Sequence, residues 1–165
     1  MPIDSPAGPL NTLEDIVQAA KRGVAMAERF VTPVLLVVAP QEEWGEITQA
    51  RPQVERDSVS VKMFPTFVIE VKGTGPISFG RGPMNRVILP FAAMSKAHGV
   101  IQYVGDAWEV SDAGSKNGTF VDGKRIHQGG VLPLRDGASL RFGDVTAKFW
   151  LPQTFLADLE RRTRT

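Results

Sequence analysis

The segments FGRGPMNRVILPFAAMSKAHGVI, residues 79–101, and WEVSDAGSKNGTF, residues 108–120, are the most informative part of this chain. Arg81 lies between two glycines directly after an alternating apolar run, so we expect it at a strand end where the backbone bends freely. Its guanidinium offers a planar fork of donors that suits an oxyanion better than the point charge of a lysine. Taken alone, an arginine between glycines is more typical of a solvated loop.

Ser95, Lys96 and His98 follow, directly before the β-prone run 100–104. The serine hydroxyl and the lysine can both act on an anionic oxygen. A serine nucleophile with a histidine base is the competing interpretation. It is disfavoured because no glycine-flanked nucleophile turn or orienting acid accompanies the pair. We therefore expect His98 to be a buried, hydrogen-bonded support of the loop.

The third group is the turn 115–119, SKNGT, which precedes the short run Phe120-Val121. Asn-Gly accepts positive φ, so this segment is expected to form a tight loop between two strands. The amide of Asn117 has two possible partners, the turn itself or the main chain of a bound peptide. Local sequence does not decide between them.

In this order and spacing, the three groups resemble the forkhead-associated (FHA) domain, whose pattern runs Gly-Arg, Ser-x-x-His and Asn-Gly-Thr. The matching residues are Gly80-Arg81, Asn85, Ser95-Lys96 with His98, and Lys116-Asn117-Gly118-Thr119. The resemblance implies a β-sandwich of the SMAD/FHA type. It also implies recognition of phosphothreonine.

What the resemblance implies can be stated residue by residue. Arg81, Ser95 and Lys96 would contact the phosphate, and Asn117 would hold the peptide backbone beside it. Lys116 stands where members often carry threonine, so a charge contact would replace a hydroxyl there. The residues expected to support the site structurally are Gly80, Asn85, His98, Gly118 and Thr119. Arg86 replaces an aspartate common in the family and is expected to add positive charge near the site.

Composition excludes several other classes of protein. The chain of 165 residues has no cysteine and two histidines, without a carboxylate cluster around them, so neither disulfides nor a metal site is expected. The expectation is therefore of no metal, no cofactor and no enzymatic activity. Residues 61–151 carry 11 basic and seven acidic side chains, which suits an anion binder but lacks the dense basic stripe of nucleic-acid binding.

The start of the sequence lacks a secretory-signal pattern, and its longest apolar run, 34–39, is too short to span a bilayer. We expect a cytoplasmic protein that does not associate with membranes. An amphipathic helix is predicted from Asn11 or Thr12, with an apolar stripe from Leu13 to Val31. We expect the stripe to pack on its own chain, although assembly with another copy or another protein is the alternative.

Residues 1–10 are expected to form a loose arm, 34–38 a buried strand, and 42–50 a short helix. From residue 61 the pattern changes to short strands separated by turns. These are predicted at 67–71, 77–80, 87–89, 100–104, 107–111, 119–121, 124–126, 139–142 and 145–151. Asp122-Gly123 predicts a hairpin. A short helix is predicted at 153–162.

The expected organisation is an all-β sandwich at 61–152, an N-terminal helical and linker appendage at 1–60, and a C-terminal helix and tail at 153–165. The leading hypothesis is a non-catalytic module that binds a phosphothreonine-containing protein or peptide in Ser/Thr kinase signalling, the partner being the kinase or its substrate. The alternative is a phosphate-independent scaffold that assembles through the sandwich or the N-terminal helix. Oligomeric state, pathway and organism do not follow from the sequence.

Overall fold

The computed structural model describes residues 11–38 and 66–164, which form two β-sheets and two helices. The seven-stranded sheet has the order β1-β3-β2-β12-β11-β8-β9, and the five-stranded sheet the order β10-β7-β6-β4-β5. The two helices are α1 (Leu13–Lys21) and α3 (Pro152–Thr163). The seven-stranded sheet contains β1 (Asn11–Thr12), β2 (Val34–Val38), β3 (Thr66–Glu70), β8 (Phe120–Val121), β9 (Lys124–Arg125), β11 (Ala138–Phe142) and β12 (Val145–Trp150). The second sheet contains β4 (Ile77–Gly80), β5 (Val87–Ile88), β6 (Gly99–Val104), β7 (Ala107–Asp112) and β10 (Val131–Pro133).

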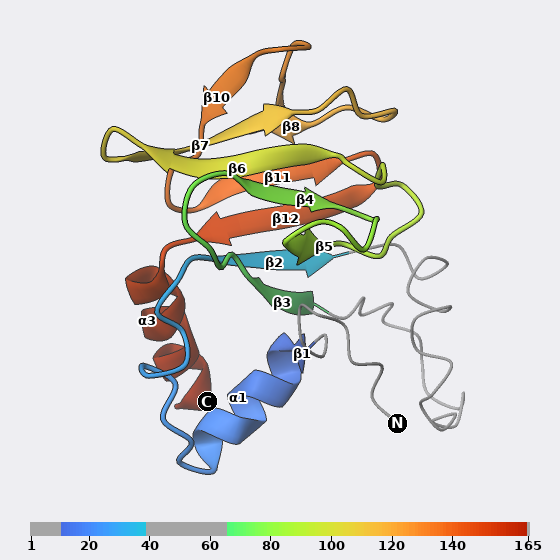
Figure 1. Cartoon of the computed structure of the whole chain (residues 1–165). Helices are drawn as coiled ribbons and strands as arrows, with labels where there is room; N and C mark the ends of the chain where they lie inside the picture. Colours follow the sequence, from blue (N-terminus) through green and yellow to red (C-terminus); the bar gives the residue numbers. More distant parts are fainter. Residues whose placement is uncertain (1–10, 39–65, 165) are drawn as a thin grey trace, which may run out of the picture.

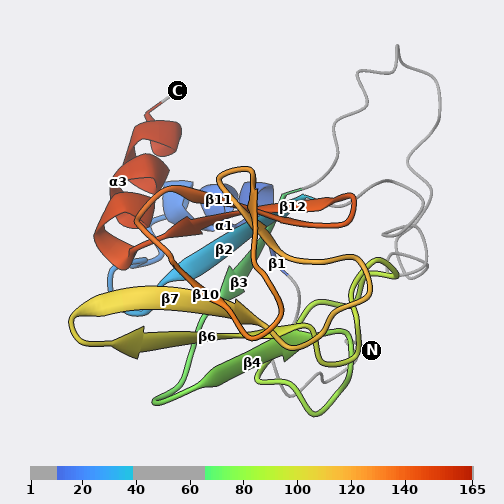
Figure 2. The same cartoon turned by 90° about the horizontal axis from the view of Figure 1, so that it is seen from above.

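The two sheets pack face to face, and both helices lie on the far side of the seven-stranded sheet (Figures 1 and 2). The predicted FHA-like β-sandwich with an N-terminal and a C-terminal helix is confirmed. In the part of the chain that the structure describes, neither helix is long and apolar enough to cross a membrane.

The main core fills the space between the sheets. β12 shows how the pattern creates it, because Val145, Ala147 and Phe149 are buried while Thr146 and Lys148 are exposed. This period-two alternation is the predicted one. Buried aromatic side chains complete the core, with the ring centroids of Phe79 and Phe142 5.3 Å apart.

A second, smaller core lies between the seven-stranded sheet and the helices. Ile16 of α1, Leu36 of β2 and Phe155 of α3 are buried there, and Phe155 meets Phe30 edge-on at 4.9 Å. The prediction that the N-terminal stripe packs on its own chain is thus confirmed. Its predicted length is wrong. α1 ends at Lys21, Gly23 follows with φ +88°, and Val24 and Val31 are 51% and 68% exposed.

β2 is an interior strand of the seven-stranded sheet, paired with β12 on one side and β3 on the other. Together with β1, two strands of the seven-stranded sheet therefore come from before residue 60, where the sequence suggested an appendage. The division into domains at 60 and 152 remains a prediction. The expected loose arm at 1–10 and the short helix at 42–50 lie outside the described residues.

All of the predicted strands are present, and their ends differ from the predicted ones by at most one residue. The Asp122-Gly123 hairpin is confirmed, because these residues have φ +49° and +83° and join the paired strands β8 and β9. Two strands were missed. β10 has three residues and contains Pro133, and β1 has two residues directly before a helix. Neither is long enough to show an alternation, so pairing across the sheet, rather than local pattern, creates both.

Candidate functional site

The three sequence groups are brought to one edge of the five-stranded sheet. Phe79 of β4 pairs with Gly99 of β6, and Gly99 pairs with Asp112 of β7. The chain following β4, the chain preceding β6 and the chain following β7 must therefore leave the sheet at the same edge. These connections carry Arg81, the segment 93–98 and the turn 115–118 respectively.

The segment 93–98 is the structural centre of this edge, because its backbone holds the other two connections. The amide of Arg81 donates to the Ser95 carbonyl at 2.9 Å, and that of Gly82 donates to the Lys96 carbonyl at 3.0 Å. The Asn85 side chain donates to the carbonyls of Gly82 and Lys96. At Gly80 a Cβ would lie 2.5 Å from the Lys96 carbonyl oxygen, so this position accepts only glycine.

Arg81 is exposed, and its guanidinium is oriented by a neutral group. Its Nε donates to the carbonyl oxygen of Met94 at 3.3 Å. Among the described residues no carboxylate forms an ion pair with it. The hydrogen bond uses one of the five guanidinium N–H groups, so the outer edge of the fork retains its donors and its charge.

Ser95 joins the 93–98 segment to the turn after β7. Its Oγ accepts a hydrogen bond from the Lys116 amide at 2.9 Å. A hydroxyl that accepts in this way still has its own proton to donate. The side chains of Lys96 and Lys116 are exposed, one on each of the two connections that this bond joins.

Asn117 is exposed at the tip of the turn after β7. One of its amide N–H groups donates to the Ala93 carbonyl at 2.9 Å, so the side chain is fixed against the 93–98 segment. The other N–H and the side-chain oxygen form no hydrogen bond with a described residue. Gly118 follows with φ +80°, the conformation that the Asn-Gly pair predicted. The amide is therefore not used up by its own turn.

His98 is fully buried between the site and the core. The Ser95 amide donates to its Nδ1 at 3.1 Å, so the proton is on Nε2, which donates to the Gly118 carbonyl at 3.1 Å. Its ring also contacts those of Phe79 and Phe142. Burial lowers the pKa of His98 below 6.5, while the Gly118 hydrogen bond and the charge of Asp112 act in the opposite direction.

Asp112 is a structural residue that sequence reasoning did not single out. Its Oδ1 accepts from the amides of Gly114 and Ser115, each at 2.8 Å, and its Oδ2 from the hydroxyls of Ser115 and Thr119. Burial acts to raise the pKa of Asp112, but these hydrogen bonds outweigh it and the pKa is lowered below 3.8. An aspartate two residues before a Gly-Ser pair is a recognisable signal for such a turn.

The expectation that Arg86 adds charge near the site is wrong. A Cβ at Gly73 would lie 2.6 Å from Arg86 Nη1, so this guanidinium lies over the connection that precedes β4. Arg81 directly follows the C-terminal end of β4, so the Arg86 guanidinium and Arg81 lie at opposite ends of this strand. Within the described ranges, no group of three or more His, Cys, Asp or Glu side chains is placed to hold a metal ion.

The sandwich and the convergence of three connections at one edge define an FHA-like module. The family model of the FHA domain matches residues 77–143, the part of the chain that includes all three connections. Residues 77–143 are therefore similar to the FHA domain in sequence.

Several solved structures of FHA domains are similar to this chain. The FHA domain of the CT664 protein from Chlamydia trachomatis is 18% identical, with a TM-score of 0.50 over 72% of this chain and 95% of that one. The FHA domain of a hypothetical protein from Arabidopsis thaliana is 22% identical, with a TM-score of 0.49 over 74% of this chain and 88% of that one. The FhaA FHA domain, solved in complex with the intracellular domain of Rv3910, is 19% identical, with a TM-score of 0.47 over 72% and 99%.

Proposed function

We propose that the edge formed by Arg81, Ser95, Lys96, Lys116 and Asn117 binds phosphothreonine within a partner protein. The observation that carries this proposal is the state of Arg81. Its guanidinium is positioned by a backbone carbonyl and is paired with no described carboxylate, so its charge is available to a ligand. A cation held in place but not neutralised is what an anion-binding site requires.

The chemistry of each group fits a phosphate dianion. The free edge of Arg81 matches two phosphate oxygens, the Ser95 hydroxyl has a proton to donate, and Lys96 and Lys116 supply charge from either side. Each hydrogen bond to a charged group contributes roughly 1.5–3 kcal/mol. After ordering costs, two or three such bonds correspond to a Kd on the order of micromolar.

Asn117 supplies the part of recognition that is independent of phosphate. With one N–H on Ala93, it presents a carbonyl oxygen and a second N–H to solvent. These two groups match the N–H and C=O of a peptide in extended conformation. The proposed ligand is therefore a phosphothreonine with its flanking main chain rather than free phosphate.

The proposed role is binding without catalysis. Both ring nitrogens of His98 are engaged by the backbone, so neither is available to take a proton from the Ser95 hydroxyl. A kinase that phosphorylates threonine must supply such a ligand, so the proposal includes a role in Ser/Thr kinase signalling as a reader of the modification.

The test begins with an oriented phosphothreonine peptide library, from which one peptide is selected. Calorimetry then measures the binding of this peptide in phosphorylated and unphosphorylated form. We expect micromolar binding of the phosphorylated form alone. Arg81→Ala should weaken it at least tenfold, because the charged contact is lost. Arg86→Ala is the matched control and should bind as the native chain does, since Arg86 lies over Gly73. Equal binding of the two peptide forms would refute the proposal.

A further inference from the structure

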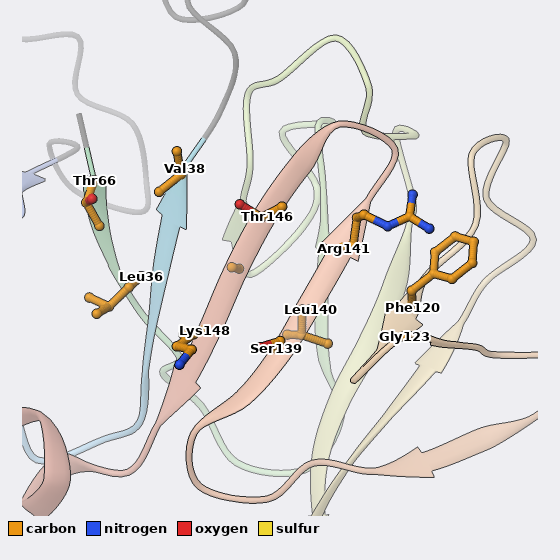
Figure 3. A pocket seen from close by; sticks show the side chains of 11 residues that line it. Leu36, Val38, Thr66, Phe120, Gly123, Ser139, Leu140, Arg141, Thr146 and Lys148 are labelled. Carbon is orange, nitrogen blue, oxygen red and sulfur yellow. The ribbon is translucent and has the colours of Figure 1, made fainter. Parts of the chain in front are cut away.

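A second surface lies on the outer face of the seven-stranded sheet. It is a shallow groove of about 470 Å³ that crosses β8, β11, β12, β2 and the start of β3 (Figure 3). The helices do not fill this part of the face. Leu36 lies at one side of the groove and Phe120 at the other, with Lys148 between them (Figure 3).

Strand register explains which side chains meet there. Phe120 pairs with Arg141, Arg141 with Thr146, and Thr146 with Val38, so these four form one row across the sheet. A neighbouring row contains Ser139, Lys148 and Leu36. Because paired residues point to the same face, both rows are directed outward.

The polar side chains of this groove are cations and hydroxyls. Arg141 lies 3.8 Å from the centroid of the Phe120 ring, and Arg125 lies 5.9 Å from it on the far side of the row. Lys148 is exposed, and none of the three forms an ion pair with a described residue. No carboxylate is among the described lining residues. The adjoining Asp122 accepts from the Ser139 amide.

The groove is continuous with the proposed phosphothreonine site. Arg141 Nη1 donates to the Gly143 carbonyl at 3.1 Å, and a Cβ at Gly143 would lie 3.4 Å from Asn117 Nδ2. A peptide bound at Asn117 that continues toward Gly143 would therefore reach Arg141 and then Phe120.

We propose that this groove docks a second, acidic segment of the phosphorylated partner, one that carries Asp or Glu together with an apolar side chain. The inference rests on the proposed function for the first contact. Carboxylates would meet Arg141, Lys148 and Arg125, while the apolar side chain would cover the half-buried ring of Phe120. Three cations around an apolar floor suit an acidic peptide better than nucleic acid, which favours a dense basic stripe.

The experiment compares three phosphothreonine peptides with one core sequence. One is short, one is extended by about ten residues containing Asp, Glu and Leu, and one has the same extension with Asn and Gln. The extension has about ten residues because these span roughly 33 Å when extended. It is tested on each flank of the phosphothreonine in turn. The acidic extension on one flank should tighten binding about three- to tenfold over the amide extension.

Lys148→Gln and Arg141→Gln should remove that gain while leaving the Kd of the short peptide unchanged. Thr66→Ala, at the edge of the groove and uncharged, is the control and should retain the gain. Equal affinity of the acidic and amide extensions on both flanks would overturn the inference. Circular dichroism on each variant confirms that the sandwich is intact.

Three further results separate the alternatives. If the chain's own acidic residues occupy the groove, Glu42→Gln with Glu43→Gln and Glu46→Gln will tighten binding of the acidic peptide, and the proposal of a partner segment fails. If a second copy occupies it, light scattering will show a dimer that Lys148→Gln dissociates, and the proposal fails equally. If the acidic segment binds whether or not threonine is phosphorylated, docking stands and the phosphothreonine proposal fails.

Discussion

At the scale of single residues, the edge of the five-stranded sheet that carries Arg81 and Asp112 has two kinds of charge. One is exposed to solvent, and the other is used in hydrogen bonds within the fold. Arg81 is held by the Met94 carbonyl and keeps its charge for a ligand, whereas Asp112 spends its charge on four internal hydrogen bonds. Opposite charges therefore lie on neighbouring connections without neutralising each other. This arrangement allows a cationic site to form beside a half-buried carboxylate whose oxygens are already hydrogen-bonded within the fold.

His98 gives a prediction about pH. Its pKa is lowered by burial, so the folded state favours the neutral ring and binds a proton less readily than the unfolded chain. The stability that follows is complete above the ordinary pKa of 6.5 and is lost as pH falls from there toward the lowered folded pKa. The loss is at most about 1.4 kcal/mol per pH unit.

Urea unfolding at pH 7.5 and 5.5 measures this effect. The native chain should be less stable at pH 5.5, and His98→Gln should be less stable than the native chain at pH 7.5 but show a smaller change between the two values. His127→Gln is the control, because His127 is exposed, and it should keep the native change. An identical change in native protein and His98→Gln would contradict the assignment.

At the scale of elements, the connection after β7 depends on one carboxylate. Asp112→Ala would remove the acceptor of two amides and two hydroxyls, one of which belongs to the fully buried Thr119. We expect a loss of about 2 kcal/mol or more in the free energy of unfolding, since a buried hydroxyl loses its partner. Phosphopeptide binding should also weaken, because Lys116 and Asn117 are placed by this turn.

Asp112→Asn separates the two effects. It keeps an oxygen for the amides of Gly114 and Ser115 but not the charge, so stability and binding should both fall between those of the native chain and Asp112→Ala. Thermal unfolding and calorimetry on the three proteins provide the measurements. Native affinity in a folded Asp112→Ala would show that the turn does not position Asn117.

The elements also show how far sequence reasoning reaches. Strands such as β12 follow from alternation alone. The resemblance to the FHA pattern singled out Arg81, Ser95 and Asn117, and the structure places them on connections at one edge of the sheet. The backbone carbonyls of Ala93 and Met94, which orient Asn117 and Arg81, carry no residue-type signal and were therefore not predictable. α1 was predicted too long because its apolar spacing continues past Gly23, where the backbone turns.

At the scale of the whole molecule, the sandwich depends on a strand that is distant in sequence from the site. β2 pairs along its whole length with β12 and with β3, and its Leu35 and Val37 are fully buried in the main core. Its opposite face, through Val34 and Leu36, forms part of the second core under the helices. β2 therefore contributes to both cores, although the FHA-family match begins only at residue 77.

Two truncations test whether β2 is part of the folding unit. A chain of residues 61–165 lacks β2, so β3 and β12 lose their shared partner and both cores lose buried side chains. We expect it to be unfolded or aggregated by circular dichroism and size-exclusion chromatography. A chain of residues 33–165 keeps β2 but lacks α1, and should fold with a lower Tm because only the second core is opened. A cooperative thermal transition in 61–165, with phosphopeptide binding retained, would instead establish that the domain begins at residue 61 and that β2 is dispensable.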